Sequence, residues 1–225
     1  MKSIKAYLKC NGGIRIIKIV LIDSGIDERY LNSDVSIVHS RKYLQKSNGE
    51  MVWITNNKIE HLHGTIVTNI ILSECTNIEI IDFNILDNKL KSNGDMMVRA
   101  LKDAIFLKPD IINLSLGTVN KKYFIKLYFL LKKAKKSNVI VVASESNIGE
   151  FTLPANLSSV IGVKTIHRKN SKKKSLNSMM ASGVPVSFNS DKVELESLCS
   201  SNSYATGAIT GFIAREMSKL KGEVL

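Results

Sequence analysis

The sequence predicts an α/β domain with three layers, in which a mostly parallel sheet lies between helices on its two faces. Short apolar runs rich in isoleucine and valine recur along the chain, and several are continuous, as in parallel strands buried on both faces. Segments with apolar residues at helical spacing separate these runs. That alternation is the order of right-handed βαβ units, which build such a domain.

In chain order, the apolar runs predict strands at Ile16–Ile22, Ser36–Val38, Ile78–Phe83, Ile111–Ser115, Val139–Ala143, Val160–Val163 and Val184–Phe188. The intervening patterns predict helices at Gly64–Ser73, Asp95–Leu107, Lys121–Ser137 and Tyr204–Leu220. In the third helix, apolar residues at helical spacing predict a core face opposite a lysine-rich outer face, and that core face consists of Phe124, Leu127, Tyr128 and Leu131. Ligands of such sheets bind beyond the carboxyl ends of the strands, so functional groups are sought there.

The composition is that of a globular protein, with 44% apolar and 23% charged residues among 225. We expect one domain spanning residues 1–225, with no separate propeptide or appended domain. No apolar run reaches the roughly 18–20 residues that span a bilayer. The segment Met1–Arg15 has no secretion-signal pattern. These features predict a cytoplasmic protein with no membrane partner.

The cysteines, Cys10, Cys75 and Cys199, are an odd number at wide spacing, which indicates reduced thiols and neither a disulfide framework nor zinc. The formal net charge is +12, concentrated in Lys132–Lys136, His167–Lys174 and Lys219–Lys221. A solvated basic surface explains this charge, and attraction of an acidic protein or peptide is the alternative. Nucleic acid is disfavoured, because no recognised nucleic-acid fold signature accompanies the basic runs.

Four polar positions are candidates for chemistry, and each has a plain structural alternative. Asp23 ends an apolar strand and needs a partner there, although a turn aspartate would satisfy local amides. His63 starts a helix, where the helix dipole favours the neutral imidazole that a general base needs; metal ligation together with His61 is a weaker alternative. Ser203 heads the last helix among small residues, as a nucleophile or an N-cap. Asn147 follows an apolar strand and is weak evidence by itself.

Together these motifs resemble those of the subtilisin-like serine peptidases, in the same chain order. They read Asp23-Ser24-Gly25, His63-Gly64-Thr65, Val142-Ala143-Ser144-Glu145-Ser146-Asn147 and Asn202-Ser203-Tyr204-Ala205. The order Asp, His, Ser is that of subtilisin. Three further stretches look like family landmarks, namely Asn113–Gly117, Leu153-Pro154-Ala155 and Val160–Val163.

The resemblance implies a subtilisin-like fold and a serine endopeptidase that works through an acyl-enzyme. Ser203 would attack the scissile carbonyl, His63 would transfer the proton and Asp23 would orient His63. Asn147 and the backbone amide of Ser203 would form the oxyanion hole. Ser115, Leu116 and Gly117 would pair with the extended substrate.

The resemblance has departures at positions that shape packing, such as Ile66, Asn69, Ser146, Ser201 and Gly207. A catalytically silent domain that binds a peptide or protein therefore stays as the alternative function. We expect no cofactor; Asp27 and Asp82 are candidate calcium ligands, with ordinary surface carboxylates as the alternative. The expected partners are a peptide or protein substrate, for example a precursor with an acidic leader segment to be removed, and an accessory or chaperone protein.

Overall fold

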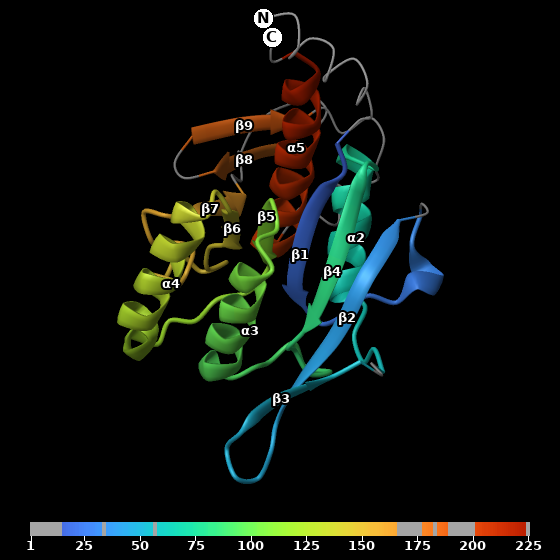
Figure 1. Ribbon diagram of the computed structural model, residues 1–225. Coiled ribbons are helices and arrows are strands. Elements are labelled where there is room, and N and C mark those ends of the chain that lie inside the picture. The colour runs from blue at the N-terminus through green and yellow to red at the C-terminus, as the bar shows by residue number, and fades with distance from the viewer. Residues whose placement is uncertain are drawn as a thin grey trace, which may run out of the picture.

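One sheet runs through the middle of the structure, and helices lie on both of its faces (Figure 1). The computed structural model describes residues 15–32, 35–55, 58–165, 177–181, 184–188 and 201–223. Within these ranges the sheet has nine strands in the order β3-β2-β4-β1-β5-β6-β7-β8-β9. The adjacent strands β2, β4, β1, β5, β6 and β7 run parallel to one another. At one end β3 pairs antiparallel with β2, and at the other end β8 and β9 continue the sheet in antiparallel fashion. The predicted fold class is confirmed.

The strands are β1 (Ile17–Asp23), β2 (Ser36–Gln45), β3 (Met51–Ile54), β4 (Ile78–Asn84), β5 (Ile111–Leu114), β6 (Ile140–Ser144), β7 (Ile161–Thr165), β8 (Asn177–Ala181) and β9 (Val184–Phe188). Every apolar run that predicted a strand is found as one, with ends that move by one or two residues except in β2. That strand continues seven residues past the predicted end at Val38, and β3 and β8 were not predicted. In β2 the added residues are mostly polar and only Tyr43 is fully buried, so the search for apolar runs misses them.

The helices are α2 (His63–Glu74), α3 (Gly94–Phe106), α4 (Phe124–Lys136) and α5 (Asn202–Glu223), and single 3₁₀ turns occur at η1 (Glu28–Tyr30) and η2 (Lys121–Tyr123). The helices α2 and α5 cover one face of the sheet, and α3 and α4 cover the other (Figure 1). Among the described residues, no helix combines the length and apolar character needed to cross a bilayer.

Two apolar cores result, one on each face, and β1 contributes to both. Val20 and Ile22 pack beneath α3 and α4, whereas Ile19 and Leu21 pack beneath α2 and α5. This division follows from the alternation of side chains along a strand. It also explains why β1 is apolar on both faces from Ile19 to Ile22, before Asp23 ends the strand.

The candidate groups gather where strands end and helices begin. Asp23 is the last residue of β1, His63 the first of α2, and Ser203 lies in the first turn of α5. Asn147 follows β6. Parallel strands direct their carboxyl ends to one edge of the sheet, so this topology brings all four segments to that edge.

Candidate active site

A buried carboxylate and imidazole form the centre of the site. Oδ1 of Asp23 lies 2.7 Å from Nδ1 of His63, and the two residues are 0% and 8% exposed. The same oxygen accepts a hydrogen bond of 2.7 Å from the amide of Ser24. With Nδ1–H donating to the carboxylate, Nε2 of the neutral ring is the nitrogen that can accept a proton.

The two motifs that carry this pair bind each other directly. The hydroxyl of Ser24 donates to the carbonyl of His61 at 2.8 Å and accepts from the amide of Gly64 at 3.0 Å. A Cβ on Gly64 would lie 2.5 Å from the carbonyl oxygen of Gly25, so only glycine lets α2 begin this close to the end of β1. The motifs Asp-Ser-Gly and His-Gly-Thr thus form one structural unit that aligns the carboxylate with the imidazole.

The titration of His63 differs from the sequence-based expectation that its place at a helix start favours neutral imidazole. Burial lowers the pKa of His63, but the hydrogen bond to Asp23 and the charge of Asp23 raise it more, so the net shift is upward from the ordinary value. That expectation leaves out the contacting Asp23 carboxylate, which is the group that raises this pKa.

Ser203 stands beside this pair, and its hydroxyl is oriented by the neighbouring strand end. Oγ of Ser203 donates to the carbonyl of Ser115 at 2.9 Å. The next residue, Tyr204, stacks its ring on the imidazole of His63, with centroids 5.4 Å apart and planes inclined by 27°. The stack brings the start of α5 against the start of α2, so Ser203 is one residue away in sequence from a side chain that contacts His63.

Asn202 locks the start of α5 to the loop that carries Asn147. Its side-chain amide donates to the carbonyls of Glu145 and Ser146 at 3.1 and 3.0 Å, and its Oδ1 accepts from the amide of Thr165 at 2.8 Å. In return, the amide of Asn202 donates to Oδ1 of Asn147 at 2.9 Å. Because Oδ1 of Asn147 is held in this way, its NH₂ group is the end that can donate to another atom.

The segment of Ser115, Leu116 and Gly117 leaves β5 next to Ser203. The hydroxyl of Ser115 donates to Oδ1 of Asn113 at 2.8 Å, and Asn113 in turn donates to Thr210 of α5 at 2.8 Å. A Cβ on Gly117 would lie 2.4 Å from Cγ2 of Thr152. This segment is therefore fixed on both sides, by α5 and by the chain around Thr152.

Sequence reasoning missed the roles of Asn202 and Tyr204. Both lie within the motif that was quoted for Ser203, but only the serine was assigned a role. For Asn202, the available signal was an amide side chain directly before a candidate nucleophile. The stacking of Tyr204 depends on where α2 crosses α5, which no local pattern indicates.

Each of the two candidate calcium ligands has a protein partner. Asp27 pairs with Arg29, with 2.6 Å between Oδ2 and Nη2, while Asp82 is buried in the sheet and accepts from the hydroxyl of Ser40 at 2.7 Å. No cluster of three or more His, Cys, Asp or Glu side chains suited to a metal occurs in the described ranges. Cys75 is a buried free thiol, and burial raises its pKa. Cys10, Cys199 and His167–Lys174 lie outside the described residues.

Comparison with solved structures defines the class of protein. A lanthipeptide protease aligns with 97% of this chain and 78% of its own, at a TM-score of 0.64 and 18% identity. The epidermin leader peptide processing serine protease EpiP from Staphylococcus aureus aligns with 92% of this chain and 67% of its own, at a TM-score of 0.60 and 16% identity. A cold-adapted subtilisin-like serine proteinase aligns with 92% of this chain and 77% of its own, at a TM-score of 0.61 and 16% identity. The fold is that of the subtilisin-like proteases.

The sequence itself matches the Subtilase family over residues 15–222. The chain belongs to the subtilase family, and it is a serine endopeptidase. No curated protein sequence matches it.

Proposed function

We propose that this chain is a processing endopeptidase that uses Asp23, His63 and Ser203 as its catalytic triad. The observation that carries the proposal is the buried contact of 2.7 Å between Asp23 and His63, on whose imidazole Tyr204, the residue after Ser203, stacks its ring. A carboxylate on Nδ1 leaves Nε2 as the base, and a serine hydroxyl beside it is the nucleophile that such a base activates.

In the proposed reaction, Oγ of Ser203 turns from the carbonyl of Ser115 to His63 and attacks the scissile carbonyl carbon. A serine hydroxyl has one proton, so it cannot donate to Ser115 and to His63 at once. His63 takes that proton and later gives it to the leaving amine, after which water releases the acyl group by the same route. Asp23 stays ionised and stabilises the imidazolium that forms between these steps.

Asn147 and the amide of Ser203 form the oxyanion hole in this proposal. The hydrogen bond from the amide of Asn202 engages Oδ1 of Asn147, and the NH₂ group of Asn147 is the proposed donor. Donors fixed before the reaction stabilise the charge that develops on the carbonyl oxygen. The segment Ser115–Gly117 is the proposed edge for pairing with the substrate backbone.

We further propose a cytoplasmic enzyme whose substrate is a precursor peptide with an acidic leader. Two structural neighbours are a lanthipeptide protease and a leader peptide processing protease, which supports this substrate class. The net charge of +12 favours an acidic segment over a basic one. An accessory protein and a single domain over residues 1–225 complete the proposal, and calcium is not part of it.

Labelling with a fluorophosphonate probe tests the triad. The parent protein should react covalently at Ser203, and Ser203→Ala and His63→Ala should each lose labelling, because both residues are needed to generate the nucleophile. Ser201→Ala, which changes a nearby serine, is the matched control and should still react. A folded parent that does not label would reject the triad proposal.

The leader proposal is tested with matched precursor peptides. One peptide carries an acidic leader, and the second carries the same leader with its acidic residues changed to lysine. We expect the ratio of kcat/KM values to favour the acidic leader and to decline as salt increases. Equal cleavage of both peptides would remove the charge argument and leave the triad intact.

One observation favours the alternative of a silent binding domain, namely that the Ser203 hydroxyl donates to Ser115 in this structure. If that bond were permanent, the domain would bind a peptide along Ser115–Gly117 without cleaving it. Absence of labelling together with peptide binding by the parent would favour this reading over the peptidase.

A further inference from the structure

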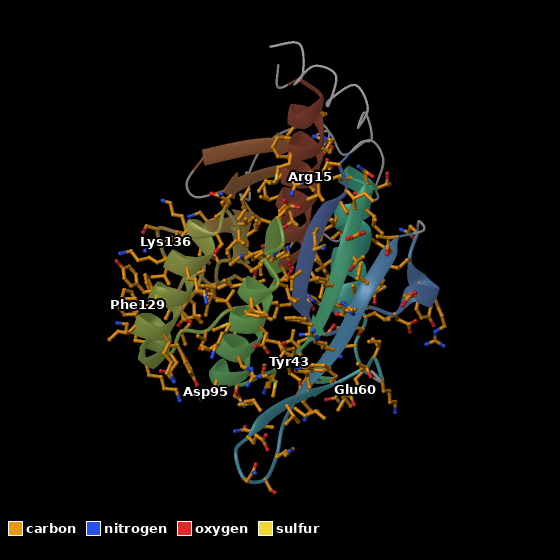
Figure 2. The ribbon with its side chains drawn as sticks, in the orientation of Figure 1. Arg15, Tyr43, Glu60, Asp95, Phe129 and Lys136 are labelled. Atoms are coloured by element: carbon orange, nitrogen blue, oxygen red, sulfur yellow. The ribbon has the colours of Figure 1, made fainter. Side chains whose placement is uncertain are left out.

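The solvent-facing side of α4 combines exposed apolar side chains with lysines. Ile125, Phe129 and Phe124 are 67%, 64% and 42% exposed, and Lys132, Lys133 and Lys136 follow them on the same helix. We call these six residues the α4 outer face. The prediction that Phe124 lies on the core face is wrong, because α4 begins at that residue and Leu127, Leu131 and Ala134 form the buried side. Figure 2 shows Phe129 and Lys136 at the edge of the molecule, directed away from the sheet.

The α4 outer face is not needed to hold the helix on the protein. Leu127, Leu131 and Ala134 point the other way and are buried in the core beneath α3 and α4. These three recur at helical spacing, which places them on one side of α4 and the exposed apolar residues on the opposite side. A merely solvated surface would gain nothing from an exposed isoleucine and phenylalanine one turn apart, so they indicate a contact.

The charge of this region specifies what the contact is made with. Residues 121–136 contain seven lysines and no acidic residue. The nearest ion pair joins Lys126 to Asp95 of α3, with 3.6 Å between Nζ and Oδ1. Nζ of Lys132 lies 4.9 Å from the ring centroid of Tyr128, which is itself stacked on Phe124, so aromatic and cationic groups share one surface.

We propose that the α4 outer face binds the surface of an anionic lipid bilayer. A convex helix with protruding aromatic and aliphatic side chains fits a planar interface, where rings enter the headgroup region and lysines contact lipid phosphates. This is attachment to a surface and involves no span. It departs from the expectation that the chain has no membrane partner.

The architecture is compatible with activity on the membrane. His63 and Ser203 start α2 and α5, which cover the face of the sheet opposite α4 (Figure 1). A bilayer on the α4 outer face would therefore not cover the starts of α2 and α5. The inference does not depend on the proposed substrate, because the surface would bind lipid whether or not the site cleaves leaders.

Sedimentation with lipid vesicles tests the proposal on the full chain. The parent should bind vesicles of phosphatidylcholine with one quarter phosphatidylglycerol, and bind pure phosphatidylcholine at least tenfold more weakly. Two variants should each lose at least tenfold in partitioning: the pair Ile125→Ser with Phe129→Ser, and the triple change of Lys132, Lys133 and Lys136 to glutamine. High salt should weaken the binding of the parent.

Matched controls distinguish binding through the α4 outer face from a general effect of charge or hydrophobicity. Tyr30→Ser removes an aromatic ring that is 55% exposed on another part of the protein. A second control changes Lys46, Lys58 and Lys219 to glutamine and so removes the same amount of positive charge elsewhere. Both should bind vesicles like the parent. Circular dichroism melting shows whether the α4 variants fold. Vesicle binding that is equal in all folded variants, or a parent that binds polyglutamate but no vesicles, would overturn the proposal.

Discussion

At the scale of single residues, the burial of Asp23 determines how the site responds to pH. A fully buried carboxylate in contact with His63 holds the imidazolium form in place, and this raises the pKa of His63 despite the opposing effect of burial. The imidazole must be neutral to accept the proton of Ser203, so activity requires a pH above that raised value. We therefore expect the acid limb of the activity profile to lie above the ordinary histidine pKa of about 6.5.

Replacing Asp23 by asparagine should move that limb and lower the rate. Loss of the negative charge removes what raises the pKa of His63, so the midpoint of the acid limb should shift to lower pH. The rate should also fall by on the order of 10⁴-fold, because asparagine no longer fixes the tautomer with Nε2 free. The measurement is the rate of fluorophosphonate labelling between pH 5 and 9. An acid limb that stays in place would show that another group controls it.

Tyr204 is the second residue with a testable effect on His63. Its ring stacks on the imidazole, and such aromatic pairs contribute about 1 kcal/mol, or roughly fivefold in rate if the contact orients the base. Tyr204→Ala should lower kcat/KM by about that factor. Tyr204→Phe keeps the ring and should restore the parent value. If phenylalanine were as slow as alanine, the hydroxyl and not the stack would be responsible.

These residues show how much of the site the sequence predicts. Asp23, His63, Asn147 and Ser203 could be chosen from their order and from the strand ends and helix starts on which they lie. Their contacts could not, because each depends on how closely α2 and α5 approach the sheet. For that reason the raised pKa of His63, the bond from Ser203 to Ser115 and the network of Asn202 came only from the structure.

At the scale of elements, the contact between α2 and α5 is what brings His63 and Ser203 together. Small residues on α5 allow it: a Cβ on Gly211 would lie 2.7 Å from both Cβ of Glu74 and the carbonyl oxygen of Ile71. An ion pair between Arg215 and Glu74 joins the same two helices further along. The fold prediction succeeded for the parallel strands that helices cover and for β9, and failed for β3 at one end of the sheet and for β8, which lies between β7 and β9.

Adding a single methyl group at Gly211 should weaken this helix pair. Alanine gains about 1 kcal/mol of helix propensity over glycine, while overpacking costs about 1–3 kcal/mol, so Gly211→Ala should destabilise the protein by about 1 kcal/mol net. Gly207→Ala is the matched control, since the nearest atoms there are 3.2 Å away and belong to Val67. Urea unfolding measures both variants. A Gly211→Ala protein more stable than the parent would contradict the close approach.

At the scale of the whole molecule, one strand ties the two cores together. Ile19 and Leu21 of β1 belong to the core beneath α2 and α5, and Val20 and Ile22 to the core beneath α3 and α4. Loss of either helix layer would expose one face of β1 to water. The strand would then also support the core on its other face less well. We propose on this ground that the chain folds as a single cooperative domain.

Two core truncations on opposite faces test that proposal. Ile71 of α2 and Leu101 of α3 are both fully buried, in different cores. Ile71→Ala and Leu101→Ala should each destabilise the protein by about 2–5 kcal/mol, because each removes buried carbons and leaves a cavity. The fluorescence of the single tryptophan, Trp53 of β3, and the far-ultraviolet circular dichroism of the helices should report the same midpoint in urea for each variant. If the fluorescence midpoint and the circular dichroism midpoint differed for Leu101→Ala but agreed for Ile71→Ala, the two helix layers would unfold independently. Formation of the site by α2 and α5 would then not require the layer that carries the α4 outer face.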